Sequence, residues 1–287
     1  MRGDVEQALI AASGVLFYVG LHQPHDAAHF TRCCISIHRL ETRKAAVPCG
    51  DVLIDSGAFT KLAKYGCYPE PVEVFAGQLH RLWTQGVVRI TAAVAQDYMC
   101  EPFMLARTGL TVAEHQRLTI ERYDALVAAL RSLFGGPPPF QVMPVLQGFT
   151  PADYISHLEA YGDRLTPGMW VGVGSVCKRQ GDIAMIETLL SGIWGMRSDL
   201  RLHGFGVKLS ALRSPVVRAL LYSADSMAWS FSAAQKCAVR VRELSRLAGR
   251  RVPTRVARRW WRRCRGVTLP DANDWREAKR FELLTRG

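Results

Sequence analysis

The sequence predicts an α/β fold, a (β/α)8 barrel of the TIM type with some irregularity, followed by a basic α-helical C-terminal extension. Short apolar runs alternate with longer amphipathic stretches, which is typical of parallel strands connected by helices. Eight such runs favour a closed barrel over an open doubly wound sheet, and 287 residues accommodate a barrel of about 250 residues plus an appendage. No Gly-x-Gly-x-x-Gly motif follows the first run, which argues against a dinucleotide-binding domain.

The strands are expected where the apolar runs lie. Several are continuous runs of four to eight residues, the pattern of strands buried on both faces. The segment between the first two strands is short, so we expect irregular structure there. The expected strands are residues 14–20, 33–38, 52–55, 88–95, 141–146, 169–173, 202–207 and 222–226.

Four helices are expected from their start signals and their apolar spacing. Pro71 opens the first, and Thr111 with Glu114 forms a capping-box pattern at the start of the second. Thr-Pro and Ser-Pro pairs open the other two. The expected helices are residues 71–85, 111–134, 150–161 and 214–222.

The positive charge is concentrated in one segment. The formal charge is +12, and residues 236–265 hold twelve Lys and Arg against one acid, Glu243, so they carry +11 of it. We therefore divide the chain into a catalytic barrel, 1–235, and a basic extension, 236–287. A solvated helical face with two apolar tryptophans is the simpler interpretation, but unpaired repulsion of this size favours contact with nucleic acid. The expected contacts are Lys208, Arg258, Arg259, Trp260, Trp261, Arg262 and Arg263.

Composition excludes several classes of protein. A chain that is 48% hydrophobic has enough apolar residues to fold, unlike a disordered chain. No apolar run reaches the ~18 residues that span a bilayer, and the start lacks a secretory signal pattern. We therefore expect a cytoplasmic protein with no membrane contact, whose eight cysteines are free thiols.

Polar residues follow nearly every expected strand, the place where barrel enzymes carry their active sites. Asp55, Asp97 and Asp225 each follow or end an apolar run. Burial would raise the pKa of such a carboxyl group unless a partner holds it ionised. Two carboxylates can supply a nucleophile and an acid/base at a sugar carbon, and a third can bind N–H groups of a ligand. Each aspartate could instead cap the helix that follows.

Metal binding is not expected. His22, His25 and His29 have near-helical spacing, but no cysteine or carboxylate lies at matching spacing. Cys100 and Cys177 are expected to be core or loop thiols.

Several of these segments resemble the tRNA-guanine transglycosylases. Residues 53–59, Leu-Ile-Asp-Ser-Gly-Ala-Phe, resemble their Asp-Ser-Gly-Gly-Phe motif, and residues 145–148 resemble their Val-Gln-Gly strand. Gly172 and Gly174 fall where their glycine-rich loop contacts the base, and Asp225 falls at the position of their nucleophile. Residues 17–24, 92–102 and 224–229 look more like the DNA-modifying branch, the 7-deazaguanine DNA transglycosylases of the DpdA group. The resemblance runs from about residue 14 to about 240.

The resemblance implies exchange of guanine in DNA for a 7-deazaguanine, the 7-cyano form (preQ0). Asp225 would attack C1′ and form a covalent intermediate, and Asp55 would act as acid/base. Asp97 would accept hydrogen bonds from the base. No cofactor is needed besides the incoming base. The remaining expected base-binding residues are Gln96, Ser56, Gln147, Gly148, Gly172 and Gly174.

The chain departs from the tRNA enzymes after the last strand. Those enzymes carry a Cys-x-Cys-x-x-Cys zinc site completed by His, whereas this chain has only Cys237 and Cys264 there and no histidine after His203. We expect no zinc. DNA is thus the favoured partner, and the target base must leave the stack, which leaves room for an accessory protein that opens the duplex. The same exchange on tRNA and a non-catalytic barrel that binds nucleic acid remain the alternatives.

Overall fold

The computed structural model describes residues 14–176, 182–207 and 211–227. Lys208, Cys177 and the whole predicted extension, 236–287, lie outside the described residues. The same holds for the arginines and tryptophans predicted to contact nucleic acid.

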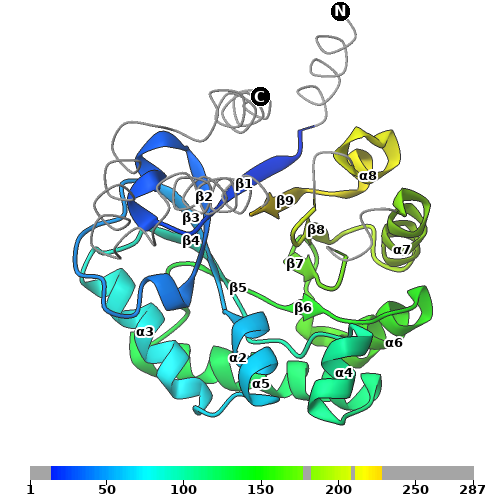
Figure 1. Cartoon of the computed structure of the whole chain (residues 1–287), viewed down its shortest axis with the longest axis horizontal. Coiled ribbons are helices and arrows are strands. Elements are labelled where there is room, and N and C mark those ends of the chain that lie inside the picture. The colour runs from blue at the N-terminus through cyan, green and yellow to red at the C-terminus, as the bar shows by residue number, and fades with distance from the viewer. Residues whose placement is uncertain (1–13, 177–181, 208–210, 228–287) are drawn as a thin grey trace, which may run out of the picture.

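Parallel strands form a single sheet that curls into a nearly closed barrel, with helices around it (Figure 1). The nine strands follow the order β5-β4-β3-β2-β1-β9-β8-β7-β6 around the sheet. The predicted α/β barrel is therefore confirmed. The strands are β1 (Leu16–Leu21), β2 (Arg32–Ser36), β3 (Asp51–Asp55), β4 (Ile90–Val94), β5 (Gln141–Met143), β6 (Val145–Leu146), β7 (Trp170–Val173), β8 (Arg201–Gly204) and β9 (Ser223–Ser226).

The ring is closed by one stretch of chain that was predicted as a single strand, 141–146. The structure divides it at Pro144, which has no N–H to donate to the ladder. The first half, β5, pairs with β4, and the second half, β6, pairs with β7. The carbonyl of Pro144 accepts a hydrogen bond of 2.8 Å from the N–H of Gly172. The two halves thus connect both sides of the barrel.

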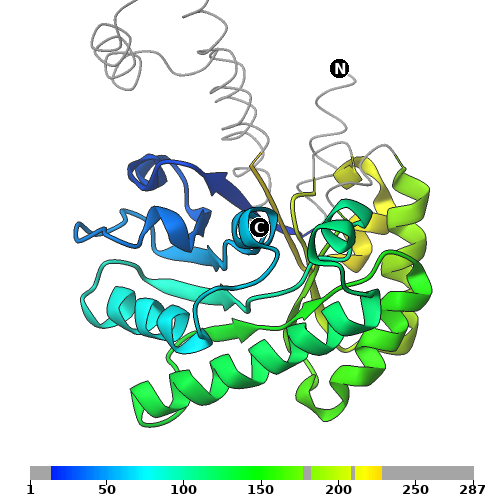
Figure 2. The same ribbon diagram turned by 60° about the horizontal axis from the view of Figure 1, so that its bottom comes forward.

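Helices cover the outside of the strands, and the long helix α5 lies across them in Figure 2. Four correspond to the predicted helices, and the capping box of Thr111 and Glu114 is present. Helices α2, α4 and α7 were not predicted. The helices are α2 (Ala58–Tyr65), α3 (Val72–Thr84), α4 (Pro102–Thr108), α5 (Val112–Phe134), α6 (Pro151–Tyr161), α7 (Ile183–Met196) and α8 (Pro215–Leu220), with 3-10 turns η1 (Pro24–His29), η2 (Ile37–Arg39), η3 (Gly162–Arg164) and η5 (Ala211–Arg213).

Two predicted strands end early. The strand predicted over 33–38 stops at Ser36, where the turn η2 begins. The strand predicted over 202–207 stops at Gly204, because Gly206 adopts a left-handed φ of 64° that breaks the extended backbone. The irregular segment expected after the first strand is the short 3-10 turn η1.

Side chains alternate between two cores along each strand. In β3, Val52 and Ile54 pack outward against the helices, whereas Leu53 packs inside the barrel. The inner cluster also holds Tyr18, Cys34, Ala92, Val94, Met143, Val145 and Trp170. This filled interior leaves the carboxyl ends of the strands as the place for polar chemistry.

Two further expectations concern cysteines and membranes. The described cysteines, Cys33, Cys34, Cys49, Cys67 and Cys100, are free thiols, as expected. Within the described ranges, no helix is both long and apolar enough to cross a bilayer.

Candidate active site

The three predicted carboxylates lie at one end of the barrel. Asp55 is the last residue of β3, Asp225 lies in β9, and Asp97 follows β4 by three residues. They also interact electrostatically: the charge of Asp225 raises the pKa of Asp55, and the charge of Asp55 raises the pKa of Asp97. The structure therefore brings together residues separated by up to 170 positions in the chain.

Asp97 is buried and paired with a neutral amide. Its Oδ2 accepts a hydrogen bond from Nε2 of Gln147, the residue that follows β6. Burial raises the pKa of Asp97 to about 7, even though the bond from Gln147 lowers it; the charges of Asp55 and Glu101 add to the rise. Near neutral pH this carboxyl group exists both with and without its proton.

The amide of Gln147 is oriented by its neighbours. Ser175 donates a hydrogen bond of 2.9 Å to Oε1 of Gln147, which turns the NH2 group toward Asp97. Ser175 adopts a left-handed φ of 59°, uncommon for a residue with a side chain. The backbone N–H of Gln147 donates to Nδ1 of His157, whose pKa burial lowers to about 4, so the ring is neutral and can accept.

The predicted glycines provide space in this part of the site. A Cβ atom at Gly174 would overlap the side chain of Gln147, and one at Gly172 would overlap the ring of Phe205. Gly148 lets the start of α6 approach, since a Cβ there would lie 2.7 Å from that of Asp153. The N–H groups of Gly172 and Gly174 are used within the barrel, by the carbonyls of Pro144 and Leu146.

Asp55 sits among groups that disfavour its charge. Burial raises its pKa, and the nearby charge of Asp225 raises it further. A hydrogen bond of 3.1 Å from the N–H of Gly57 to its Oδ2 lowers the pKa, as do a hydrogen bond with the side chain of Ser36 and the charge of His38. A carboxyl group with a raised pKa can hold a proton closer to neutral pH and give it up.

Asp225 is buried, and two nitrogen atoms lie close to the same oxygen of its carboxyl group. Its Oδ1 accepts a hydrogen bond of 2.9 Å from the N–H of Gly206 and lies 3.3 Å from Nε2 of His203. His203 is fully buried in β8, and its Nδ1 lies 2.8 Å from Oγ of Ser223. Both residues were missed from the sequence. The only sequence signal was a histidine in an apolar run directly before Gly-Phe-Gly.

The comparison with protein families decides between the barrel proteins that could carry such a site. A family model described as DeoxyPurine in DNA protein A (DpdA) matches residues 15–279, most of the chain. The chain belongs to the DpdA family. A comparison with curated proteins gave no match. DpdA membership confirms the resemblance seen in the sequence, and it implies a transglycosylase of the 7-deazaguanine type that acts on DNA.

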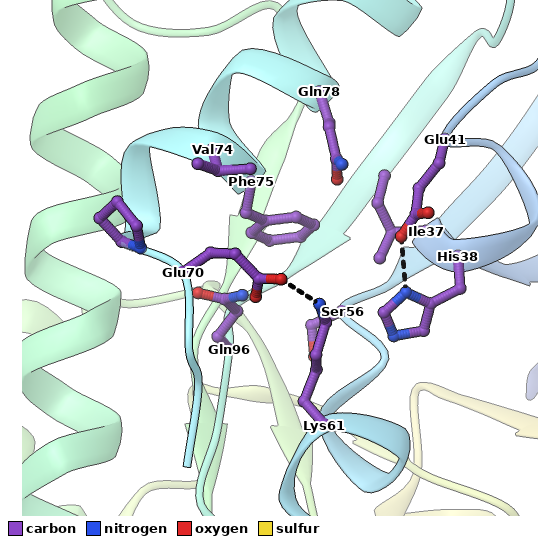
Figure 3. Close-up of a pocket in the computed structure, with 11 residues that line it drawn as sticks. Ile37, His38, Glu41, Ser56, Lys61, Glu70, Val74, Phe75, Gln78 and Gln96 are labelled. Carbon is purple, nitrogen blue, oxygen red and sulfur yellow. Dashed lines mark hydrogen bonds and ion pairs between the residues drawn. The ribbon is translucent and has the colours of Figure 1, made fainter. Parts of the chain in front are cut away.

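A second polar group of this DpdA protein lies around Ser56, the residue that follows Asp55 in the chain (Figure 3). Gln96 and Ser56 belong to it rather than to the pair of Asp97 and Gln147. Oε1 of Gln96 accepts two hydrogen bonds from the guanidinium of Arg122, at 3.0 and 2.7 Å. Oγ of Ser56 is buried and forms no hydrogen bond within the described residues.

These two residues line a cavity of about 190 Å³. Two ion pairs border it, Lys61 with Glu70 at 2.7 Å and His38 with Glu41 at 2.8 Å, both drawn in Figure 3. Val74 and Phe75 supply part of an apolar side. The cavity lies next to Asp55, because Ser56 follows it in the chain.

Metal ligands do not gather in the part of the chain that the structure describes. No three of its His, Cys, Asp and Glu side chains are placed to hold a metal ion. Of the near-helical histidines, His25 pairs with Asp26 at 3.0 Å, and Nδ1 of His22 lies 3.3 Å from Arg39.

Proposed function

We propose that this DpdA protein replaces guanine in DNA with 7-cyano-7-deazaguanine, through a covalent bond between Asp225 and the sugar. The observation that carries the proposal is the pairing of two unlike carboxyl groups. One oxygen of Asp225 accepts a hydrogen bond from the N–H of Gly206 and lies close to Nε2 of His203, whereas burial and the charge of Asp225 raise the pKa of Asp55. A nucleophile needs an ionised carboxylate and an acid needs a proton, and the raised pKa of Asp55 suits this residue to the role of the acid.

In the first step, Oδ2 of Asp225 attacks C1′ of the target nucleotide. The C1′–N9 bond breaks, and its electron pair moves onto guanine. Asp55 gives its proton to the departing base, so guanine leaves neutral. The sugar remains attached to Asp225 as an ester.

In the second step, the incoming 7-deazaguanine uses the same residues in reverse. Asp55, now a carboxylate, takes the proton from N9 of the new base. N9 attacks C1′, and the ester bond to Asp225 breaks. Both carboxyl groups return to their starting states, so the exchange needs no cofactor.

Asp97 and Gln147 would hold either base in the same orientation. The ionised carboxylate of Asp97 accepts from the N1–H and the exocyclic amine of guanine or of 7-deazaguanine. Gln147 and Ser175 keep this carboxylate in place. Ser56, Gln96, Gly148, Gly172 and Gly174 remain predicted contacts at the border of the base site.

The basic extension would hold the DNA backbone while the target base is extruded. Replacing Arg258, Arg259, Arg262 and Arg263 by Gln should weaken DNA binding and flatten its salt dependence. Each phosphate contact contributes about 0.9 to the slope of log K against log salt, so the slope should fall by about 3 to 4. Fluorescence anisotropy at several salt concentrations measures it, and an unchanged slope would remove the extension from DNA binding.

Nucleoside analysis by mass spectrometry tests the whole proposal. The chain is co-expressed with a source of 7-cyano-7-deazaguanine, and DNA and tRNA are digested separately. We expect the modified deoxynucleoside in DNA with the native chain and none with Asp225→Asn. Modification confined to tRNA would replace the proposed substrate. Modification by the Asp225→Asn variant at the native level would remove Asp225 as the nucleophile.

A further inference from the structure

A line of buried polar groups leads from the interior of the barrel to Asp225. The indole N–H of Trp170 donates a hydrogen bond of 2.7 Å to Oγ of Ser223, and the same oxygen lies 2.8 Å from Nδ1 of His203. On the far side of the ring, Nε2 lies 3.3 Å from Oδ1 of Asp225. Three neighbouring strands contribute these four residues, β7, β8 and β9.

Strand register explains why the four side chains meet. Ser223 and Asp225 are two residues apart in β9, so both point to the same face. His203 is paired directly with Ser223 across the ladder. Trp170 lies in the inner cluster and packs against His203, with ring centroids 5.9 Å apart.

The donors and acceptors in this series of hydrogen bonds can be assigned in order. An indole can only donate, so Ser223 accepts from Trp170 and has one proton of its own to place. Nδ1 of His203 is the acceptor within reach, which puts the proton of the neutral ring on Nε2. Nε2 then donates to Asp225. In the opposite tautomer, a lone pair on Nε2 would face the carboxylate oxygen.

We propose that Trp170 and Ser223 hold His203 in the tautomer that is protonated on Nε2, and that His203 is a positioning residue for Asp225. Together with the N–H of Gly206, it fixes Oδ1 and leaves Oδ2 as the oxygen that attacks C1′. The inference rests on the proposed role of Asp225. Its tests therefore use formation of the covalent intermediate, which Asp225→Asn should abolish.

The variants remove the line one group at a time. His203→Ala should slow intermediate formation about 10- to 100-fold, by analogy with the loss of a residue that orients a metal ligand. His203→Gln keeps an N–H donor and should recover part of this loss. Ser223→Ala and Trp170→Phe should give smaller losses in rate. Each removes a hydrogen bond that favours the Nε2-protonated tautomer of His203, but the imidazole ring itself remains. The Michaelis constant for DNA should change less than about twofold, because only the reacting oxygen is affected.

A matched control separates positioning from packing. His115 is also fully buried, but it bonds to Thr108 and to the carbonyl of Met99 rather than to a carboxylate. His115→Gln should lower the melting temperature while leaving the rate of intermediate formation unchanged. Single-turnover mixing with oligonucleotide DNA, followed by denaturing gels, measures that rate for every variant.

Nitrogen-15 NMR of histidine-labelled protein tests the tautomer directly, even if a variant fails to fold. We expect the native His203 ring to carry its proton on Nε2 and Ser223→Ala to mix the two tautomers. A proton on Nδ1 in the native protein would overturn the proposal, as would native rates of intermediate formation in both His203→Ala and Ser223→Ala. Product formation by Asp225→Asn would instead overturn the proposed function.

Discussion

Strand β3 carries an aspartate at each end, and the two sit in opposite environments. At the amino end, Asp51 accepts a hydrogen bond of 3.1 Å from Arg32 and one of 2.9 Å from the hydroxyl of Tyr18. At the carboxyl end, Asp55 is bonded to the N–H of Gly57 and lies under the influence of a second carboxylate, Asp225. The same residue type on the same strand is thus neutralised at one end and left near a like charge at the other.

From this difference we expect Asp51 to be a structural carboxylate and Asp55 a chemical one. Arg32 and the hydroxyl of Tyr18 offset the loss of hydration at Asp51, so removing this carboxylate would leave both partners without it. Burying Asp55, Asp97 and Asp225 near one another works against folding, and the raised pKa values of Asp55 and Asp97 express that cost. Proton transfer and base recognition are tasks that require such groups.

Removing the carboxyl group of Asp55, at the carboxyl end of β3, should have the largest effect on activity. Asp55→Asn removes the proton donor, and we expect exchange to fall about 10²- to 10⁴-fold. The free energy of unfolding should stay the same or rise, because repulsion with Asp225 disappears. Single-turnover assays and urea unfolding measure the two quantities. Native turnover by this variant would take Asp55 out of the acid/base role.

Asp97 extends the comparison to the pH dependence of stability. Its pKa is about 7 in the folded protein against 3.8 as the reference value, so the folded state holds a proton that the unfolded state loses between these values. Stability should therefore fall as the pH rises from about 4 to about 7 and then level off. Asp97→Asn lacks this loss, so its stability relative to the native chain should rise by up to about 4 kcal/mol between pH 4 and pH 8.

Urea unfolding at several pH values tests that expectation. The difference between Asp97→Asn and the native chain should be small at pH 4 and grow toward pH 7. A constant difference over this range would show that burial does not raise the pKa of Asp97. The variant should also lose guanine recognition, because an amide at this position presents a donor toward the base N–H groups.

Much of the fold followed from the sequence because its signals are local. Apolar runs marked every strand, and the capping box of Thr111 and Glu114 marked the start of α5. Helix α7 was missed because apolar residues occupy most of its length and hide the helical period. The division of the strand 141–146 depends on pairing with two different neighbours, which a single run of residues does not reveal.

The place of the three carboxylates at one end of the barrel was also predictable, since each ends or follows an apolar run. The polar groups around Asp225 were not. His203, Ser223 and Trp170 form hydrogen bonds with residues of other strands, and only the barrel register shows that they share an inner face. Ser56 and Gln96 are each adjacent in sequence to a predicted carboxylate of the site, and both line the neighbouring cavity.

Substitution of Asp51, at the amino end of β3, should have the smallest effect on activity and should contrast most clearly with substitution of Asp55. Asp51→Asn leaves Arg32 without its carboxylate, and because both side chains keep some contact with solvent, we expect a loss of about 1–2 kcal/mol in unfolding free energy. Exchange should stay within about twofold of the native rate at a temperature where the variant is folded. A double-mutant cycle with Arg32→Gln should give a coupling of about 1 kcal/mol. If Asp51→Asn reduced exchange as strongly as Asp55→Asn, the two ends of the strand would not have separate roles, and charge inside the barrel as a whole would control the chemistry.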